Sequence, residues 1–145
     1  MKVKELQPLF EKYSNDPTEE NAERFFETLR DMIVAGAKIS MPYVKDILSG
    51  TTVAATITGL NDRIWFPICF MTKELNINTP IMPGTQMITK LVTIREVLKN
   101  TLEDKKIDGV VFNPFAEHPV ALDKNAIVQI YGELFKDSGP KMILM

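Results

Sequence analysis

The sequence has very few of the side chains that carry covalent or metal chemistry, with one cysteine, one histidine and one tryptophan in 145 residues. A single cysteine cannot form a disulfide within the chain, which favours a reducing compartment. One histidine and one cysteine cannot complete a structural zinc site, and the carboxylates are scattered, so we predict no metal. The formal net charge is only −2, which gives no electrostatic reason to expect nucleic acid as a partner.

Other absences narrow the classes of function further. The chain has no glycine-rich phosphate-binding motif and no calcium-binding loop, so we predict no cofactor. No apolar run approaches the roughly 18 residues of a membrane span, and the first residues lack the apolar core of a signal peptide. We therefore expect a cytoplasmic protein without a membrane partner.

The composition is that of an ordinary globular domain, with 45% hydrophobic and 25% charged residues. The length indicates one domain over residues 1–145. The pattern of elements predicts an α/β fold of the α+β type, in which helices pack on a largely antiparallel or mixed sheet.

Helices are predicted at three places. Residues 1–35 show helical periodicity with a restart at Asp16-Pro17-Thr18, and Gly36 ends the segment. A second helix follows Thr93-Ile-Arg-Glu96, which has the pattern of a capping box. A third helix begins after Asp123.

Strands are predicted near residues 38–44, 52–58, 63–71 and 86–92, where β-branched and aromatic residues concentrate. We expect these strands to form an antiparallel meander. Pro67 favours a bulge or an edge position for the third strand. One core is predicted to contain Phe25, Leu29, Trp65, Phe70, Val111, Ile127 and Tyr131.

The most informative segment lies near the C-terminal end. The apolar strand Val110–Phe112 stops at Asn113-Pro114, a loop with the only histidine follows, and Val120–Leu122 is predicted to be the antiparallel neighbour of the first strand. The apolar tail Met142–Met145 could form a last strand, and it predicts weak or moderate self-association through open strand edges.

Three ordered stretches carry a resemblance to a known family. They are residues 63–75 with the turn Phe70-Met71-Thr72, the helix over residues 91–102, and Asp108–Pro114 followed by Val120–Asp123. In these stretches the chain resembles the N-terminal domain of the SseB family, named for enhanced serine sensitivity. Residues 36–60 depart from that pattern, and longer members continue into a second domain. The resemblance implies an α/β domain without an assigned catalytic mechanism.

The candidate binding residues are Thr72, Asn113, Pro114, Glu117 and His118. We predict that the loops Thr72–Leu75 and Asn113–His118 lie together at one end of the sheet, because both follow strands and function tends to sit on loops held by a rigid scaffold. The alternative is that both motifs only terminate strands, with the Asn113 side chain bonded to nearby backbone.

Two side chains were weighed for catalysis, and we assign no catalytic residue. Cys69 lies in an apolar strand without a nearby histidine, which favours a buried thiol over a nucleophile. His118 as an acid or base needs an orienting carboxylate and a reacting group within hydrogen-bond reach, and a histidine in a surface turn is the simpler interpretation.

Three functions stay open. The leading hypothesis is a non-enzymatic binding or regulatory module of the SseB type, with an unidentified protein or small molecule as partner. The second is a small enzyme that uses residues 113–118, with His118 as acid or base. The third is a structural subunit that assembles through an edge strand, so a homo-oligomer is left open.

Overall fold

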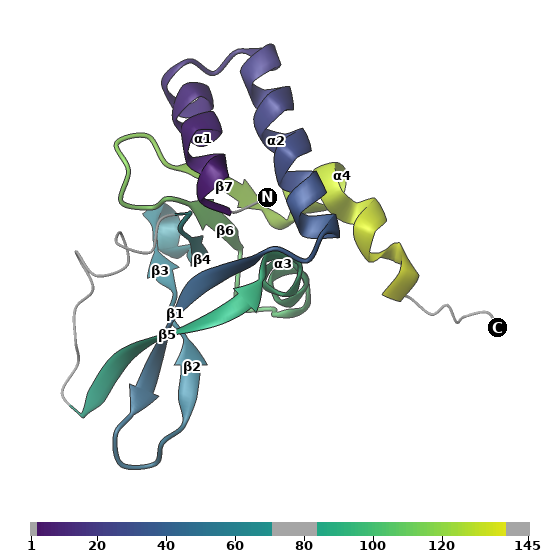
Figure 1. The fold of residues 1–145 in the computed structure, drawn as a ribbon. Coiled ribbons are helices and arrows are strands. Elements are labelled where there is room, and N and C mark those ends of the chain that lie inside the picture. The colour runs from purple at the N-terminus through teal and green to yellow at the C-terminus, as the bar shows by residue number, and fades with distance from the viewer. Residues whose placement is uncertain (1–2, 71–83, 139–145) are drawn as a thin grey trace.

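The computed structural model describes residues 3–70 and 84–138, which form an α+β domain of helices and two small sheets (Figure 1). Short 3₁₀ segments lie at Val3–Glu5, Leu60–Asp62 and Gly132–Ser138. The regular elements in chain order are α1 (Leu6–Asn15), α2 (Glu19–Val34), β1 (Lys38–Asp46), β2 (Thr52–Ala54), β3 (Ile57–Thr58), β4 (Ile64–Ile68), β5 (Thr85–Thr93), α3 (Ile94–Glu103), β6 (Gly109–Phe112), β7 (Val120–Asp123) and α4 (Lys124–Tyr131).

The strands divide between two sheets rather than forming one meander. One sheet has the order β2-β1-β5 with antiparallel pairs, and the other has the order β3-β4-β6-β7, in which only the β4–β6 pair is parallel. The predicted strand over residues 52–58 is two short strands, one in each sheet. The predicted meander is wrong because β5 returns to β1, and a parallel neighbour of β4 requires a crossover connection.

The helix boundaries follow the capping residues that the sequence predicts. The hydroxyl of Thr18 accepts a hydrogen bond from Asn21 N–H, the hydroxyl of Thr93 accepts from Glu96 N–H, and the carboxylate of Asp123 accepts from an N–H in the first turn of α4. Gly36 follows α2 with a φ of 77°, in the left-handed region that favours glycine. Local chemistry therefore sets the helix ends.

The core lies between the helices and one face of the four-stranded sheet. Phe25 from α2 meets Phe112 of β6 edge to face at 5.7 Å, and Phe70 stacks on Phe112 at the same distance. Phe10 of α1 contacts both Phe25 and Phe70 at 6.0 Å. Offset and edge-to-face aromatic pairs add to the burial of their area, so this cluster joins the N-terminal helices to the sheet.

Two residues of the predicted core lie on the opposite face of the four-stranded sheet. Phe66 and Ile68 of β4 point into the core, so alternation turns Trp65 outward, where it is only half-buried. Val111 is 9% exposed, but its neighbours Val110 and Phe112 are the core residues of β6. The assignment of Trp65 to the core was therefore wrong, whereas Val111 is buried as predicted but lies outside the main cluster, and the other predicted members are buried within it.

Pro67 lies within β4, a strand with a neighbour on each side. The carbonyl of Ile68 accepts from Asn113 N–H, so backbone alternation points the nitrogen of Pro67 away from β6. On that side β3 pairs only with Ile64 and Trp65. The missing N–H therefore costs no ladder hydrogen bond, and the predicted edge position holds for this part of β4.

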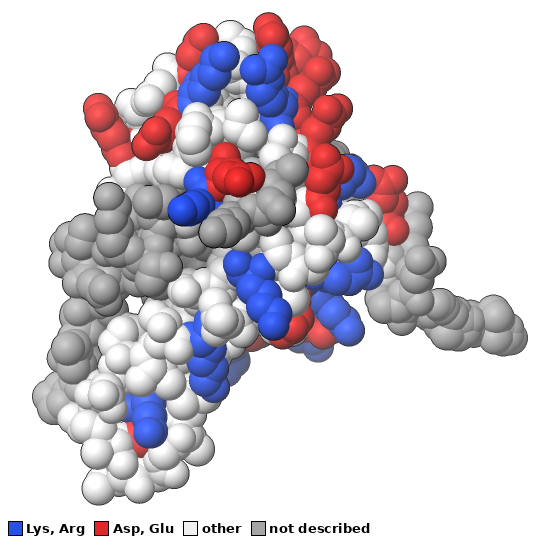
Figure 2. Space-filling model, viewed as in Figure 1, with Lys and Arg blue, Asp and Glu red and all other residues white. Residues whose placement is uncertain are grey.

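The three-stranded sheet, here called the arm, projects from the helical body (Figure 1). Its root is fixed where Ile94 N–H donates to Ala37 O at 3.0 Å. Its strands carry three lysines and one aspartate, whereas residues 6–34 of the α1–α2 hairpin carry seven acidic and three basic residues. Figure 2 shows this difference as a mostly uncharged arm below acidic groups that gather over the helices.

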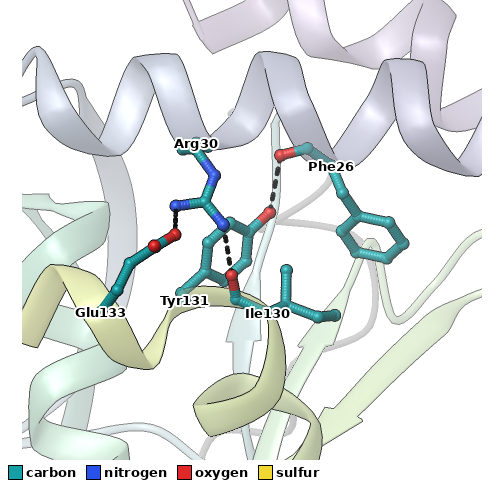
Figure 3. Close-up of polar contacts among 5 residues, drawn as sticks. All are labelled: Phe26, Arg30, Ile130, Tyr131 and Glu133. Atoms are coloured by element: carbon teal, nitrogen blue, oxygen red, sulfur yellow. Dashed lines mark hydrogen bonds and ion pairs between the residues drawn. The ribbon is translucent and has the colours of Figure 1, made fainter.

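The C-terminal helix is held against α2 by a group of polar contacts (Figure 3). The guanidinium of Arg30 pairs with Glu133, donates to Ile130 O and lies 5.4 Å from the ring centre of Tyr131. The Tyr131 hydroxyl donates to Phe26 O at 2.9 Å. Burial raises the pKa of the Tyr131 phenol, and the charge of Arg30 partly opposes this rise.

Candidate functional site

Strand β6 is bounded by two polar side chains, one of which binds the first residue of β4 and the other a residue just beyond its end. The carboxylate of Asp108 accepts from Ile64 N–H at 2.8 Å, and the amide oxygen of Asn113 accepts from Phe70 N–H at 3.1 Å. These bonds fasten the two ends of the parallel pair. The Asp108 and Asn113 side chains of the Asp108–Pro114 motif therefore have a structural role in the chain.

Asn113 is fully buried and adopts a φ of 48°, which asparagine tolerates better than most residues. Its side-chain amide also donates to the side chain of Gln7 in α1 at 2.9 Å. Its carbonyl accepts from Ala116 N–H and closes the turn that follows. The side chain thus joins the end of β6 to Phe70 and to α1, and a ligand could reach it only by displacing these partners.

Three of the remaining predicted site residues lie on the loop between β6 and β7. Pro114 lines a groove on the outer sheet face, whereas Glu117 and His118 are exposed. Thr72 and the loop Thr72–Leu75 lie outside the described residues. The hydrogen bond between Phe70 and Asn113 brings the chain that follows β4 close to the loop Asn113–His118. The predicted contact of that loop with Thr72–Leu75 stays a prediction.

The histidine has part of the geometry that an acid–base role needs. His118 Nε2 lies 3.7 Å from Glu117 Oε1, although side-chain exposures of 56% and 88% leave both groups in solvent. Among the described residues, His118 has no hydrogen bond to a serine, threonine or cysteine that it could activate. Cys69 is buried as predicted, with 3% exposure. The arrangement is an exposed histidine–carboxylate contact, and the described residues place no nucleophile beside it.

The groove beside the loop has a volume of about 430 Å³ and lies on the outer face of the four-stranded sheet. Its apolar floor comes from the side chains of β3, β4, β6 and β7, and two prolines of the loop form one wall. The lining residues are Ile57, Gly59, Asn61, Arg63, Trp65, Val111, Pro114, Pro119 and Ala121.

Gly109 explains how Trp65 can lie across this face. The two residues are partners in the β4–β6 register. A Cβ atom at residue 109 would lie 2.8 Å from the Trp65 ring and 2.7 Å from Asp123 Cα, and it would also meet Leu122 O. Only glycine leaves room for the indole beside the backbone of β7, so the glycine of the motif shapes the groove.

Two polar groups of the groove have no strong partner among the described residues. The indole N–H of Trp65 donates to no protein acceptor there, and the guanidinium of Arg63 lies 5.7 Å from the Trp65 ring centre without an ion pair. A larger hollow of about 640 Å³ contains Arg30, but Glu133 and Ile130 already bind that cation. The groove at Trp65 therefore offers a donor and a cation beside an apolar floor.

The sequence pointed to the loop but missed the sheet face next to it. Trp65 and Arg63 were not among the candidate residues because Ile64–Ile68 is apolar throughout. Such a run contains no polar side chain that would mark its outer face.

Comparisons with family models, with curated proteins and with solved structures found no match to this chain. The SseB resemblance therefore stays a prediction from the sequence. None of the helices within residues 3–70 and 84–138 is long and apolar enough to cross a membrane. In the same part of the chain, no group of three or more histidine, cysteine, aspartate or glutamate side chains could hold a metal ion.

Proposed function

We propose that the protein is a non-enzymatic binding module of the SseB type, and that the groove at Trp65 receives a segment of a partner protein. The observation that carries this proposal is the groove itself, an apolar floor beside an indole N–H and a guanidinium that have no hydrogen-bond or ion-pair partner within residues 3–70 and 84–138. Hydrophobic surface supplies the affinity in such sites, and a few placed polar groups fix the orientation of the ligand.

The side chains of the groove define the chemistry of the segment. An apolar side chain would cover Val111 and Ala121, and a backbone carbonyl would accept from the indole of Trp65. A carboxylate beside it would pair with Arg63, which is exposed. We therefore propose a short extended segment that has an apolar residue next to an acidic one.

Selection from a random peptide library on the purified protein tests this proposal. Trp65 is the only tryptophan, so titration with the selected peptides should change the intrinsic fluorescence directly. Arg63→Glu should weaken binding by roughly tenfold or more, because it replaces attraction by repulsion at the carboxylate. Ala121→Glu should weaken binding by placing a charge on the apolar floor.

Two matched variants separate the groove from other surfaces. Val34→Ser removes an apolar side chain that is 65% exposed on α2, and it should leave peptide affinity unchanged. His118→Ala removes the group on which the enzyme hypothesis depends, and it should also leave affinity unchanged. Selected peptides that bind equally well to Arg63→Glu and Ala121→Glu would contradict the proposal.

We also propose a cytoplasmic location, supported by the single cysteine and its burial. Fractionation of cells that express the tagged chain, with markers for each compartment, measures this directly. Recovery in a secreted or membrane fraction would contradict it.

A further inference from the structure

Strand β5 forms one edge of the arm, since no described strand pairs with its outer side. Two hydrogen bonds fix the direction of its backbone groups. Ile47 N–H donates to Gly84 O, and Ile94 N–H donates to Ala37 O, both at 3.0 Å and both in line with the β1–β5 register. The even-numbered residues of β5 therefore bond to β1, and the odd-numbered residues direct their N–H and C=O groups outward.

The outward-bonding residues at the centre of this edge form a symmetric pattern. Met87, Thr89 and Leu91 have their side chains on one face of the arm, and the pattern reads apolar, threonine, apolar in either direction. Leu91 is 71% exposed, and Val53 of β2 is 65% exposed on the same face. An exposed edge strand with apolar side chains is a template for pairing with another chain.

We propose that the protein forms a homodimer in which two β5 strands pair antiparallel about a two-fold axis at Thr89. Each arm then contributes three strands to one continuous six-stranded sheet. The axis places Thr89 opposite Thr89 of the second copy, and Met87 opposite Leu91 of the second copy. A two-fold interface needs a surface that is complementary to itself. This edge meets that condition, because threonine pairs with threonine and apolar side chains pair with apolar side chains.

The single charge on the edge disfavours one neighbouring register. Pairing about Thr89 places Lys90 opposite Ile88 of the second copy. Pairing about Lys90 would instead place two lysines directly opposite each other, which is unfavourable. Within its own arm, the Lys90 ammonium lies 4.5 Å from the ring centre of Tyr43 and donates to the Thr52 hydroxyl at 2.8 Å. The lysine is thereby held over its own sheet.

The dimer depends on the arm and not on the groove at Trp65, so each can be correct without the other. A contact made mainly by two strand edges is smaller than the roughly 1,200–2,000 Å² of stable complexes. We therefore expect a reversible dimer whose population rises with protein concentration.

Analytical ultracentrifugation of the full chain over a wide concentration range tests the dimer, and Thr89→Pro tests the edge. Because the N–H of Thr89 points away from β1, proline removes a donor only from the dimer contact. The variant should keep its circular dichroism spectrum and melting temperature while the dimer dissociation constant rises roughly tenfold or more. A full chain that stays monomeric at all concentrations would overturn the proposal, as would a dimer that Thr89→Pro leaves unchanged.

A charge exchange tests the register. Met87→Lys alone should weaken the dimer because it places a charge opposite Leu91, and Leu91→Glu alone should weaken it because it places a charge opposite Met87. The double variant pairs each lysine with a glutamate of the second copy and should recover much of the lost affinity. Val34→Lys on α2 is the control for added charge and should leave the dimer unchanged. Failure of the double variant to exceed both single variants would overturn the register and the two-fold axis with it.

Discussion

Replacement of Asn113 tests whether the Asn-Pro motif is structural, because this residue combines two side-chain bonds with a left-handed backbone. Asn113→Ala removes the acceptor of Phe70 N–H, which is buried, and the donor to Gln7. It also places alanine at a φ of 48°, where an L residue with a Cβ is strained. Asn113→Gly removes the same bonds but relieves the strain, so the two variants separate the contributions.

The magnitudes follow from the contacts. A buried N–H left without an acceptor costs about 1–3 kcal/mol, and the left-handed conformation costs alanine about 1–2 kcal/mol. We therefore expect Asn113→Ala to lower the free energy of unfolding by about 2–5 kcal/mol. Glycine avoids the strain, but the greater entropy of its unfolded chain costs about 0.4–1 kcal/mol. The central values of these two effects make Asn113→Gly more stable than Asn113→Ala by about 0.8 kcal/mol.

Urea unfolding, followed by Trp65 fluorescence and by circular dichroism, measures these differences as midpoint shifts at constant slope. Gln7→Ala is the matched control. It removes the acceptor of the Asn113 amide and an exposed bond to Glu11, but it keeps the bond to Phe70 N–H and the backbone of residue 113, so it should cost less than Asn113→Ala. Wild-type midpoints in both Asn113 variants would refute the structural role of the side chain. An alanine variant as stable as the glycine variant would refute the argument from the backbone.

Three further changes should affect stability. Leu29→Ala, at a fully buried core position, should lower the free energy of unfolding by about 2–5 kcal/mol, whereas Val34→Ala on the exposed side of α2 should change it by about 0.5 kcal/mol or less in the same urea assay. Gly109→Ala should cost about 3 kcal/mol or more, because the new methyl group would collide with Leu122 O and lie 2.7 Å from Asp123 Cα in the backbone of β7. It should also shift the emission of Trp65, whose ring would lie 2.8 Å away; an unchanged spectrum and midpoint would contradict this. Because burial raises the pKa of Tyr131, the stabilisation from its neutral phenol should be complete below about pH 10 and decline at higher pH. Tyr131→Phe should be less stable than the wild type at neutral pH and should lose less stability on alkaline titration. Parallel plots of unfolding free energy against pH for the two proteins would contradict the raised pKa.

The helices were predicted well because their limits depend on neighbours in the chain. Thr93 and Asp123 bind N–H groups three residues away, and Gly36 supplies a local turn. The division of strands between two sheets was not predicted, because β5 pairs with β1 across about forty residues of chain. Nothing in the local pattern of a strand specifies which distant strand it joins.

The candidate site was predicted only in part for the same reason. The sequence singled out Asn113, but its hydrogen bond to Phe70 joins residues 43 positions apart and could be recognised only in the folded structure. Trp65 was assigned to the core because it lies in an apolar strand run. Trp65 lies on the outer face because alternate residues of β4 point to opposite faces. Since every residue of this strand is apolar, only the packing of the folded chain decides which alternate set faces the core.

The fastening of β4 to β6 at both ends determines where the chain can change in length. Asn113 lies five residues after Asp108, and Phe70 lies six residues after Ile64. The two hydrogen bonds between these residues therefore fix the length of each segment relative to the other. One residue inserted between these points would break one fastening and turn the following side chains to the opposite face. We therefore expect insertions and deletions in homologous sequences to fall in the hairpin at residues 47–51 and in the loop at residues 114–119. The number of residues between Asp108 and Asn113 should stay constant.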